Sequence, residues 1–251
     1  MGRKKKVVII TGGGHGIGKN FAYGLAAEGA RVVLAEADYG ACQEVAAKIM
    51  EGGGEALALH TDVTSEESVK EMANKVIQTY GAIDVLVNNA AIFSTLKMKP
   101  LEDIEVDEWD RAMSVNLRGM FLAVKAVIPQ MKKQNSGKII NISSTTVFSG
   151  APYFIHYVTS KAGIIGFTRA AAKELGPFGI AVNVITPGLT ETDETKNVIP
   201  KERFKTVKDL RAFKRSQKPE DILGPLSFLI SEKSNFITGQ IINVDGGHCF
   251  P

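Results

Sequence analysis

The residues best suited to proton chemistry are Tyr157 and Lys161, four positions apart, with Ser144 thirteen positions before the tyrosine. Residues four apart share one face of a helix, so a helix here would hold the lysine ammonium beside the phenol. A neighbouring positive charge stabilises phenolate and lowers a tyrosine pKa that is otherwise near ~10. This spacing indicates a general acid or base. By itself the pair is weak evidence, because such pairs also arise by chance on amphipathic helices.

A cluster of glycines near the start of the chain has the pattern of a nucleotide-binding turn. The β-branched run 7–11 leads directly into a helical pattern through Gly12, Gly13, Gly14, Gly16 and Gly18. Glycine lets the backbone turn sharply and approach a ligand, and free N–H groups at a helix start attract a diphosphate. A glycine-rich turn with no ligand would carry the entropic cost of these glycines without a purpose. We therefore predict a pyrophosphate site.

The spacing of these glycines separates two kinds of nucleotide site. It is Gly-x-x-x-Gly-x-Gly, not the strict Gly-x-Gly-x-x-Gly of many dinucleotide-binding proteins. The stretch 13–19 also fits the P-loop template, but Asn20 stands where a P-loop needs a hydroxyl for magnesium. A dinucleotide is therefore favoured over a mononucleotide.

With these residues in view, the chain resembles a classical short-chain dehydrogenase/reductase over nearly its whole length. Four positions match the catalytic tetrad of that family in type and spacing: Asn116, Ser144, Tyr157 and Lys161. The resemblance implies hydride transfer between a nicotinamide and a carbonyl or carbinol carbon, with Tyr157 passing the proton and Ser144 holding the substrate oxygen. It also implies that Lys161 holds the nicotinamide ribose, and that Asn116 fixes a water linking Lys161 to solvent.

The resemblance further implies a set of cofactor-binding residues spread along the chain. They are Gly12, Gly14, His15, Gly16, Ile17, Gly18, Glu36, Asp62, Val63, Asn89, Ala90, Ala91, Tyr157, Lys161, Pro187, Gly188, Thr190 and Thr192. Ala91 departs from the family, which usually has glycine there, but the change is from one small residue to another.

The choice between NAD and NADP depends on Glu36 and His15. Glu36 follows the predicted strand 31–35, where dinucleotide-binding folds present an acid to the adenosine ribose. A carboxylate there accepts hydrogen bonds from ribose hydroxyls and repels a 2′-phosphate. Relatives that use NADP usually carry Arg or Lys at the position of His15. We expect NAD to be preferred; the alternative is that Glu36 points to solvent and Asp38 is an ordinary helix cap.

Strand patterns alternate with helical patterns along the chain, at 6–11, 31–35, 56–60, 83–88, 138–142, 181–186 and 241–244. Such an alternation of Val- and Ile-rich strands with helices predicts an α/β, Rossmann-like, doubly wound parallel sheet with helices on both faces. Ligands bind beyond the carboxyl ends of these strands. Five candidate positions each follow a strand end and are expected to meet in one crevice: Gly12, Asp62, Asn88, Ser144 and Pro187.

Two helical regions carry further expectations. Asn is a poor helix-interior residue, so Asn116 inside the helical pattern 109–131 predicts a local distortion, with a merely solvated Asn as the alternative. The segment 189–218 is dense in charge, and a long insertion between strands is often a mobile active-site lid. The alternative for that segment is a solvated pair of helices.

Composition limits the remaining classes of function. The chain has 251 residues, is 44% hydrophobic and has no Pro- or Ser-rich linker, so we expect one domain over 1–251. Without a run of eighteen apolar residues or an apolar signal region, a cytoplasmic protein without membrane contact is expected. Cys42 and Cys249 are far apart, and the histidines show no metal spacing, so no metal is expected. Net charge is +3 with a basic run only at 3–6, which predicts no nucleic-acid partner.

Together these features predict an NAD-dependent oxidoreductase acting on a secondary alcohol or ketone. Phe93, Phe148, Tyr153 and Phe154 favour an apolar, ring-bearing substrate, although core packing explains aromatic residues equally well. The chain resembles relatives that act on aromatic secondary alcohols and on pyridoxal-type alcohols. It is also similar to NADPH-dependent 3-oxoacyl-[acyl-carrier-protein] reductases, which stay open as an alternative.

Two further alternatives are less favoured. A non-enzymatic nucleotide sensor on this fold would be expected to have lost the tetrad, which is intact here. A nucleotide-sugar epimerase would need an additional substrate domain. The helix expected at 153–175 carries Ile164, Ile165, Phe167, Ala170 and Ala171 beyond one sheet-facing stripe, which indicates a homotetramer of two-fold symmetry.

Overall fold

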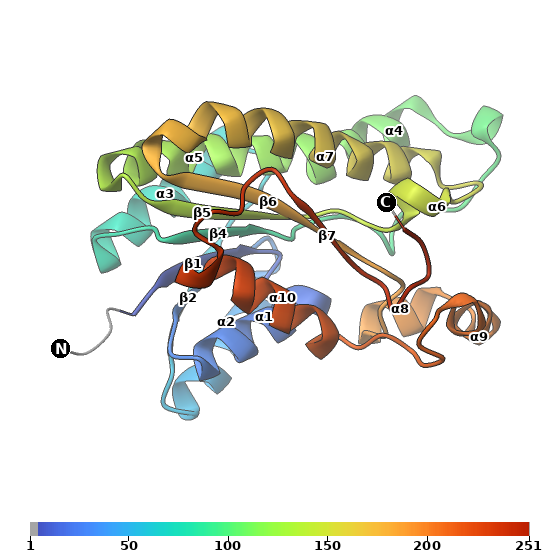
Figure 1. Ribbon diagram of the computed structural model, residues 1–251, viewed down its shortest axis with the longest axis horizontal. Helices are drawn as coiled ribbons and strands as arrows, with labels where there is room; N and C mark the ends of the chain where they lie inside the picture. Colours follow the sequence, from blue (N-terminus) through green and yellow to red (C-terminus); the bar gives the residue numbers. More distant parts are fainter. Residues whose placement is uncertain (1–4, 251) are drawn as a thin grey trace.

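The computed structural model describes residues 5–250, which fold as one parallel sheet between two layers of helices (Figure 1). The strands are β1 (Val7–Thr11), β2 (Arg31–Glu36), β3 (Glu55–His60), β4 (Val85–Asn88), β5 (Gly137–Ile142), β6 (Ile180–Pro187) and β7 (Ile241–Val244). Their order in the sheet is β3-β2-β1-β4-β5-β6-β7, and every pairing is parallel. The doubly wound, Rossmann-like sheet predicted from the sequence is confirmed.

Helices cover both faces of this sheet (Figure 1). One face carries α1 (Gly16–Ala27), α2 (Tyr39–Glu51) and α10 (Glu220–Ile230), and the other carries α3 (Glu66–Tyr80), α5 (Gly119–Gln134) and α7 (Ile155–Leu175). The shorter helices are α4 (Val106–Met113), α6 (Thr146–Ser149), α8 (Asp193–Val198) and α9 (Lys201–Leu210). Single 3-10 turns lie at η1 (Leu101–Asp103), η3 (Gly176–Phe178) and η4 (Glu232–Ser234).

Strand β1 shows why the sequences of the central strands are unbroken runs of apolar residues. Val8 and Ile10 belong to the core beneath α1, α2 and α10. Val7 and Ile9 belong to the core beneath α3, α5 and α7. Successive side chains of a strand point to opposite faces, so a strand with a core on each side must be apolar at every position.

The strand order reverses between β1 and β4, which places a topological switch point at the centre of the sheet. The chain runs outward from β1 to β2 and β3, and then returns to pair β4 with the free side of β1. Thr11 and Asn88, the last residues of β1 and β4, are paired in register. Open α/β sheets bind ligands beyond the carboxyl ends of their strands at such a point.

Helices α4 and α5 join through the π-helical turn η2 (Ser114–Arg118) into one long helix. By length and composition this helix, Val106–Gln134, could cross a membrane. Its residues Ala123, Val124, Val127 and Met131 are buried in the core on the sheet. Core packing therefore accounts for its apolar character.

The ends of the described chain and the 189–218 segment complete the fold. Of the basic run 3–6, Arg3 and Lys4 lie outside the described residues, and Lys5 Nζ donates a hydrogen bond to Glu55 Oε1 at 2.9 Å. The 189–218 segment contains α8 and α9, and its Thr190 forms an isolated bridge to Gln217. Two helices fit both expectations for this segment, and its mobility stays a prediction.

Candidate active site

The turn between β1 and α1 is packed so closely that several of its positions admit only glycine. Gly12 has φ +66°, and a Cβ on Gly18 would lie 2.1 Å from the Gly12 carbonyl oxygen. Asn89 Nδ2 donates hydrogen bonds to the carbonyl oxygens of Thr11 at 3.2 Å and Gly12 at 3.0 Å. Asn89 and Ala90 also donate their N–H groups to Thr11 Oγ1, each at 3.1 Å. The end of β4 therefore holds the glycine turn against the switch point.

Glu36 and Asp38 have different roles at the end of β2. The Gly14 N–H donates to Glu36 Oε2 at 3.3 Å, so Glu36 faces the glycine turn rather than solvent alone. Asp38 caps α2 by accepting the Ala41 N–H at 3.1 Å, and that hydrogen bond, with help from His15, lowers the pKa of Asp38. His15 Nε2 lies 3.2 Å from Asp38 Oδ2. Glu36, the last residue of β2, thus bonds the backbone of the glycine turn, and Asp38 is the cap of α2.

The segment after β3 lies at the same edge of the sheet. Asp62 Oδ1 accepts hydrogen bonds from the N–H and Oγ1 of Thr64, at 2.8 and 2.7 Å, which fixes the turn. Val63 is buried, and a Cβ on Gly119 would lie 2.9 Å from Val63 Cγ2. Ala91, the position that departs from the family pattern, is exposed at the end of β4.

Tyr157 and Lys161 lie on the first turns of α7, and both are buried. Lys161 Nζ is 5.7 Å from the centre of the Tyr157 ring and donates a hydrogen bond to the Ile142 carbonyl oxygen at 3.0 Å. Burial raises the pKa of Tyr157 to about 12, against the opposing effect of a hydrogen bond with the Ser144 side chain. Burial also lowers the pKa of Lys161 to about 8.

The expectation that Lys161 lowers the tyrosine pKa is therefore wrong for this structure. A four-residue spacing on a helix brings the two side chains together, but it does not reveal how far they are removed from water. Removal from water disfavours the charged form of both groups, so the phenolate and the ammonium are each destabilised. The phenol is protonated at neutral pH.

The two neighbouring serines at the end of β5 have separate partners. Ser143 Oγ donates to the Lys161 carbonyl oxygen at 2.7 Å and so braces the backbone of α7. Ser144 Oγ accepts hydrogen bonds from the N–H and Oγ1 of Thr146, at 3.2 and 2.9 Å, and the Ser144 side chain acts to lower the pKa of the Tyr157 phenol, against the effect of burial. Ser144, the residue singled out by its spacing, is the one that contacts the phenol.

Asn116 lies inside the π-helical turn η2, which is the local distortion expected from its sequence position. It is buried, accepts the Ile92 N–H on Oδ1 at 2.8 Å, and donates from Nδ2 to the Ile92 carbonyl oxygen at 3.2 Å. Nδ2 also donates to Ser160 Oγ at 3.1 Å, and Ser160 Oγ donates to the Tyr157 carbonyl oxygen at 2.7 Å. Asn116 therefore connects the loop after β4 to the helix that carries Tyr157.

Aromatic residues surround the phenol on one side. The Phe154 ring stacks on the Tyr157 ring at 4.8 Å, and the Phe93 ring meets Tyr157 edge-on at 5.4 Å. The other two aromatic candidates lie elsewhere: Phe148 packs on the cluster around Ile164, and Tyr153 is 61% exposed. Two of the four aromatic residues named from the sequence thus contact the tyrosine.

The segment after β6 crosses in front of the glycine turn. Thr190 Oγ1 donates to the Gly188 carbonyl oxygen at 3.0 Å, and Thr192 caps α8 by accepting the Thr195 N–H at 3.2 Å. The N–H of Gly16 donates to Glu194 Oε1 at 3.1 Å. Glu194 was absent from the sequence prediction, because nothing in the sequence relates two residues 178 positions apart.

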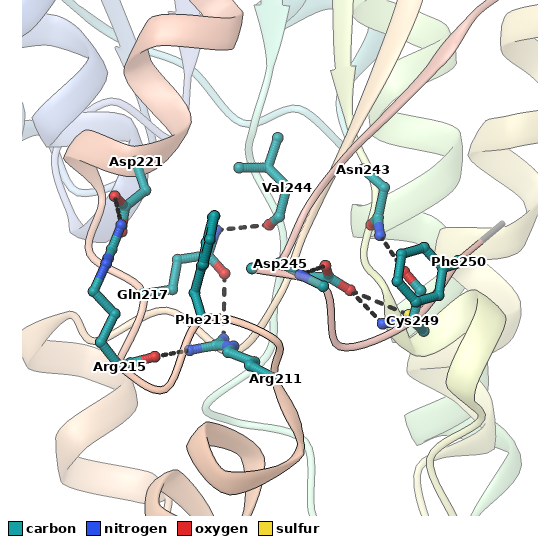
Figure 2. A pocket seen from close by; sticks show the side chains of 12 residues that line it. Arg211, Phe213, Arg215, Gln217, Asp221, Asn243, Val244, Asp245, Cys249 and Phe250 are labelled. Atoms are coloured by element: carbon teal, nitrogen blue, oxygen red, sulfur yellow. Dashed lines mark hydrogen bonds and ion pairs between the residues drawn. The ribbon is translucent and has the colours of Figure 1, made fainter.

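A cavity of about 430 Å³ lies between the residues after α9 and the C-terminal tail (Figure 2). Arg211 is buried there and donates from Nη2 to the Leu189 carbonyl oxygen at 2.7 Å and to Gln217 Oε1 at 3.3 Å. Burial lowers the pKa of Arg211. None of the tetrad residues lines this cavity, and the hydrogen bonds of Arg211 link Leu189 and Gln217, the two ends of the 189–218 segment.

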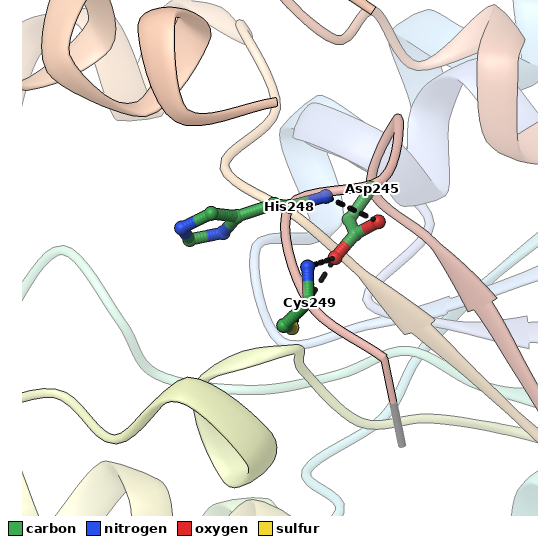
Figure 3. A group of neighbouring side chains, drawn as sticks. All are labelled: Asp245, His248 and Cys249. Atoms are coloured by element: carbon green, nitrogen blue, oxygen red, sulfur yellow. Dashed lines mark hydrogen bonds between the residues drawn. The ribbon is translucent and has the colours of Figure 1, made fainter. Parts of the chain in front are cut away.

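The C-terminal tail brings three potential metal ligands together: Asp245, His248 and Cys249 (Figure 3). One ligand atom from each lies within 4.8 Å of the others. The Asp245 carboxylate accepts the N–H groups of Gly247, His248 and Cys249 at 2.9, 3.1 and 2.9 Å. These hydrogen bonds explain the cluster as the cap of a tight turn, and the expectation of no metal stays a prediction.

Fold and site together are those of a dinucleotide-dependent oxidoreductase: a glycine turn lies at the switch point of a doubly wound sheet, and a buried Ser-Tyr-Lys cluster lies after β5 and on α7. A family model described as enoyl-(acyl carrier protein) reductase matches residues 12–248. The chain is 40% identical over 242 residues to an uncharacterized oxidoreductase of Mycobacterium tuberculosis, covering 96% of each chain. It is 38% identical over 245 residues to a 3-oxoacyl-[acyl-carrier-protein] reductase of Synechocystis, covering 96% of each.

Solved structures agree with these relatives. An NAD+-bound xylitol dehydrogenase matches with a TM-score of 0.88 and 32% identity, over 96% of this chain and 98% of that one. A 3-ketoacyl-(acyl-carrier-protein) reductase from Brucella melitensis in complex with NADH matches with a TM-score of 0.90 and 32% identity, over 98% of each chain. The chain belongs to the short-chain dehydrogenase/reductase family, whose members are oxidoreductases that use a nicotinamide cofactor.

Proposed function

We propose that this protein is an NAD-dependent oxidoreductase that interconverts secondary alcohols and ketones, with Tyr157 as the general acid and base. The observation that carries the proposal is the buried cluster of Tyr157, Ser144 and Lys161, in which Lys161 Nζ lies 5.7 Å from the centre of the phenol ring. A phenol that can exchange a proton beside a hydroxyl that can hold a substrate oxygen is suited to carbonyl chemistry.

The residues at the switch point fit a dinucleotide. The N–H of Gly16, at the start of α1, already holds an anion, the Glu194 carboxylate, at 3.1 Å. A helix start with free N–H groups attracts a diphosphate in the same way. We assign the diphosphate to Gly12, Gly14, His15, Gly16, Ile17 and Gly18, with Thr190 and Thr192 in front of it. Asp62 and Val63 are assigned to the adenine, Asn89, Ala90 and Ala91 to the adenosine side of the crevice, and Pro187 and Gly188 to the nicotinamide.

Each tetrad residue has one task in this proposal. When bound, the nicotinamide ring supplies or accepts the hydride. Ser144 Oγ orients the substrate oxygen, and Tyr157 gives that oxygen a proton in the direction of reduction or removes it in the direction of oxidation. The pKa of Tyr157, raised by burial to about 12, keeps the phenol protonated at neutral pH, which suits proton donation to a carbonyl oxygen. Asn116 holds the start of α7 in place through Ser160.

The preference for NAD rests on Glu36. Its carboxylate faces the glycine turn through the Gly14 N–H at 3.3 Å and would lie where the adenosine ribose is recognised. An anion there accepts hydrogen bonds from ribose hydroxyls and repels a 2′-phosphate. His15, in the place of a phosphate-binding Arg or Lys, is engaged with Asp38 at 3.2 Å.

The rings of Phe93 and Phe154 beside Tyr157 support an apolar substrate, because they present flat hydrophobic surface next to the proton donor. A relative named cyclopentanol dehydrogenase, from Comamonas testosteroni, is 36% identical over 99% of both chains and gives independent support for a cyclic alcohol. The likeness to the Synechocystis enzyme favours a second candidate, an NADPH-dependent 3-oxoacyl-[acyl-carrier-protein] reductase.

The proposal extends to the setting of the enzyme. We propose one domain over residues 1–251, in which 189–218 is the substrate lid, assembled as a homotetramer in the cytoplasm. Its partner would be a small-molecule alcohol or carbonyl compound, without a metal, nucleic acid or membrane.

Turnover on a panel of cyclic, aromatic and β-ketoacyl substrates, with NAD(H) and NADP(H) in parallel, tests the proposal. We expect activity on cyclic or aromatic alcohols and a preference for NAD of roughly 100-fold, the equivalent of about 2.8 kcal/mol. Tyr157→Phe keeps the ring but removes the proton, so we expect it to lower kcat about 10²- to 10⁴-fold. Equal use of both cofactors, or a Tyr157→Phe variant with more than a third of normal turnover, would contradict the assignment.

A further inference from the structure

Glu194, a residue of α8, reaches across the switch point to the first residue of α1. Its Oε1 accepts the Gly16 N–H at 3.1 Å. Its Oε2 is 3.0 Å from the place that a Cβ on Gly16 would take. Oε2 is buried and has no hydrogen-bond partner among the described residues. The Glu194 carboxylate thus packs against the glycine turn, with Oε1 hydrogen-bonded to Gly16 and Oε2 without a hydrogen-bond partner among the described residues.

The Glu194 carboxylate supplies a negative charge that the start of α1 otherwise lacks. Within the described chain, α1 has no acidic residue in its first turn, and His15 makes no side-chain cap. A helix start carries partial positive charge from its free N–H groups and is stabilised by a nearby anion. Glu194, brought from the 189–218 segment, takes that place.

The charge on Glu194 is supported from several directions. Burial works against ionisation, but the neighbouring N–H of Glu194 itself, the Thr192 hydroxyl and the Gly16 N–H, with a contribution from His15, lower the pKa of Glu194. His15 Nδ1 is 3.9 Å from Oε1. The group is therefore an anion at neutral pH.

Resting on the function proposed above, we propose that Glu194 occupies the diphosphate subsite of the cofactor-free protein and is displaced when the cofactor binds. The same N–H of Gly16 cannot serve the carboxylate and a phosphate oxygen together, and two anions in one partly buried site repel each other. Because Glu194 is part of α8, its displacement moves the first helix of the 189–218 segment. Cofactor binding and the position of that segment are thereby coupled.

The surroundings offer the displaced carboxylate another place. A cavity of about 340 Å³ lies beside Gly16 and is lined by charged residues of both signs, the acidic Glu191, Asp193 and Glu220 and the basic Lys19, Lys196 and Lys218. A carboxylate that leaves the glycine turn can exchange one backbone N–H for these ammonium groups. In this displacement the Glu194 carboxylate loses its hydrogen bond with the Gly16 N–H and gains interactions with the lysine ammonium groups.

Isothermal titration of NADH into the full-length protein tests the coupling through Glu194→Gln, which keeps the shape of the side chain but removes its charge. We expect the Kd for NADH to fall about tenfold. Glu202→Gln is the matched control: it makes the same substitution at an exposed residue of α9 that does not line this cavity, and its Kd should stay within twofold of the original protein. Glu194→Ala removes the charge without introducing an amide, so its Kd for NADH should also fall if the charge is what matters.

Hydrogen exchange of α8 in the absence of cofactor gives a second, independent measurement. We expect exchange to be faster in Glu194→Gln than in the original protein, and NADH to accelerate exchange in the original protein. An unchanged or weaker affinity in Glu194→Gln, with NADH still bound by the original protein, overturns the coupling and leaves the proposed function standing. Failure of the original protein to bind NADH or NADPH at all overturns both.

Discussion

At the residue scale, Lys161 combines an ionisable side chain with almost complete burial. It is 3% exposed, and its Nζ has the Ile142 carbonyl oxygen as an acceptor at 3.0 Å. Burial lowers its pKa from 10.5 to about 8. Below that pH the folded protein holds a charge that the surrounding apolar atoms destabilise, so Lys161 lowers stability, and its proposed role in catalysis accounts for its presence.

We therefore predict that Lys161→Met abolishes turnover but raises the free energy of unfolding at pH 7 by about 1–3 kcal/mol. Between the folded pKa of about 8 and the unfolded value of 10.5, the unfolded chain binds a proton that the native protein has lost. The original protein therefore gains stability with rising pH in that window, and the advantage of the variant shrinks.

Urea denaturation at pH 7 and pH 9.5, followed by the fluorescence of the single tryptophan, measures this difference. Lys173→Met, an exposed position on the same helix, is the control and should change stability little at either pH. A Lys161→Met variant that is less stable than the original protein at pH 7 would contradict the argument.

At the scale of elements, the π-helical turn η2 interrupts the regular α-helical geometry of the long helix Val106–Gln134. The turn places Asn116 so that it bonds both backbone groups of Ile92 and the hydroxyl of Ser160. Such bulges are frequent at functional sites. Here the irregular turn links the loop after β4 with α7, so the crevice wall and the helix carrying Tyr157 are fixed to each other.

We predict that Asn116→Ala lowers the free energy of unfolding by about 1–3 kcal/mol, because it leaves buried polar groups without partners, and lowers kcat as well. Asn183 offers a matched control on β6. It donates to the Ile237 carbonyl oxygen at 2.9 Å and accepts the Gln240 N–H at 3.0 Å, away from the tetrad. Asn183→Ala should lose similar stability and keep kcat. Equal losses of kcat in both variants would show that Asn116 acts only through stability.

The elements themselves follow from local patterns in the sequence. All the strands were predicted, because a parallel sheet with a core on each face requires runs such as Val7–Thr11. The distortion at Asn116 was also predicted, since an amide inside a helix competes with the backbone. The spacing of Ser144, Tyr157 and Lys161 places these residues together because strand ends and helix starts meet at one edge of the sheet.

What the sequence did not predict depends on burial and on contacts distant in the chain. The direction of the Tyr157 pKa shift was wrong, because helical spacing says nothing of the packing of Phe93 and Phe154 around the phenol. The contact of Glu194 with Gly16 links positions 178 residues apart. Such contacts follow from the docking of α8 onto α1, not from any local pattern.

At the scale of the whole molecule, α7 is the helix to which the sequence assigned assembly, and α5 packs beside it through Phe121 and Phe167. Ile164, Ile165 and Ala171 are buried inside the chain, so they do not supply the surplus apolar surface expected from the sequence. Phe121, 44% exposed, lies edge-on to Phe167 at a ring distance of 6.5 Å and keeps apolar surface on α5.

We predict a homotetramer, whose light scattering at micromolar concentration gives four times the 27.0 kDa of the chain. Phe121→Asp should reduce that mass by placing a charge on the proposed interface. Met50→Asp introduces the same charge at a residue of α2 that is 53% exposed, on the opposite side of the sheet, and should leave the mass unchanged. A monomer in the original protein would contradict the prediction.

The order of the strands also governs how the chain folds during synthesis. β1 pairs with β2 nearby in the chain, but its other neighbour, β4, begins only at Val85. Pairing across long crossovers is slow, and chains fold from the N-terminus as they emerge from the ribosome. All residues of the half of the sheet from β3 to β4, which holds the glycine turn, are synthesised before Ser144, Tyr157 and Lys161. We therefore expect the nascent chain to form the proposed cofactor-binding turn before it acquires the residues proposed to move a proton.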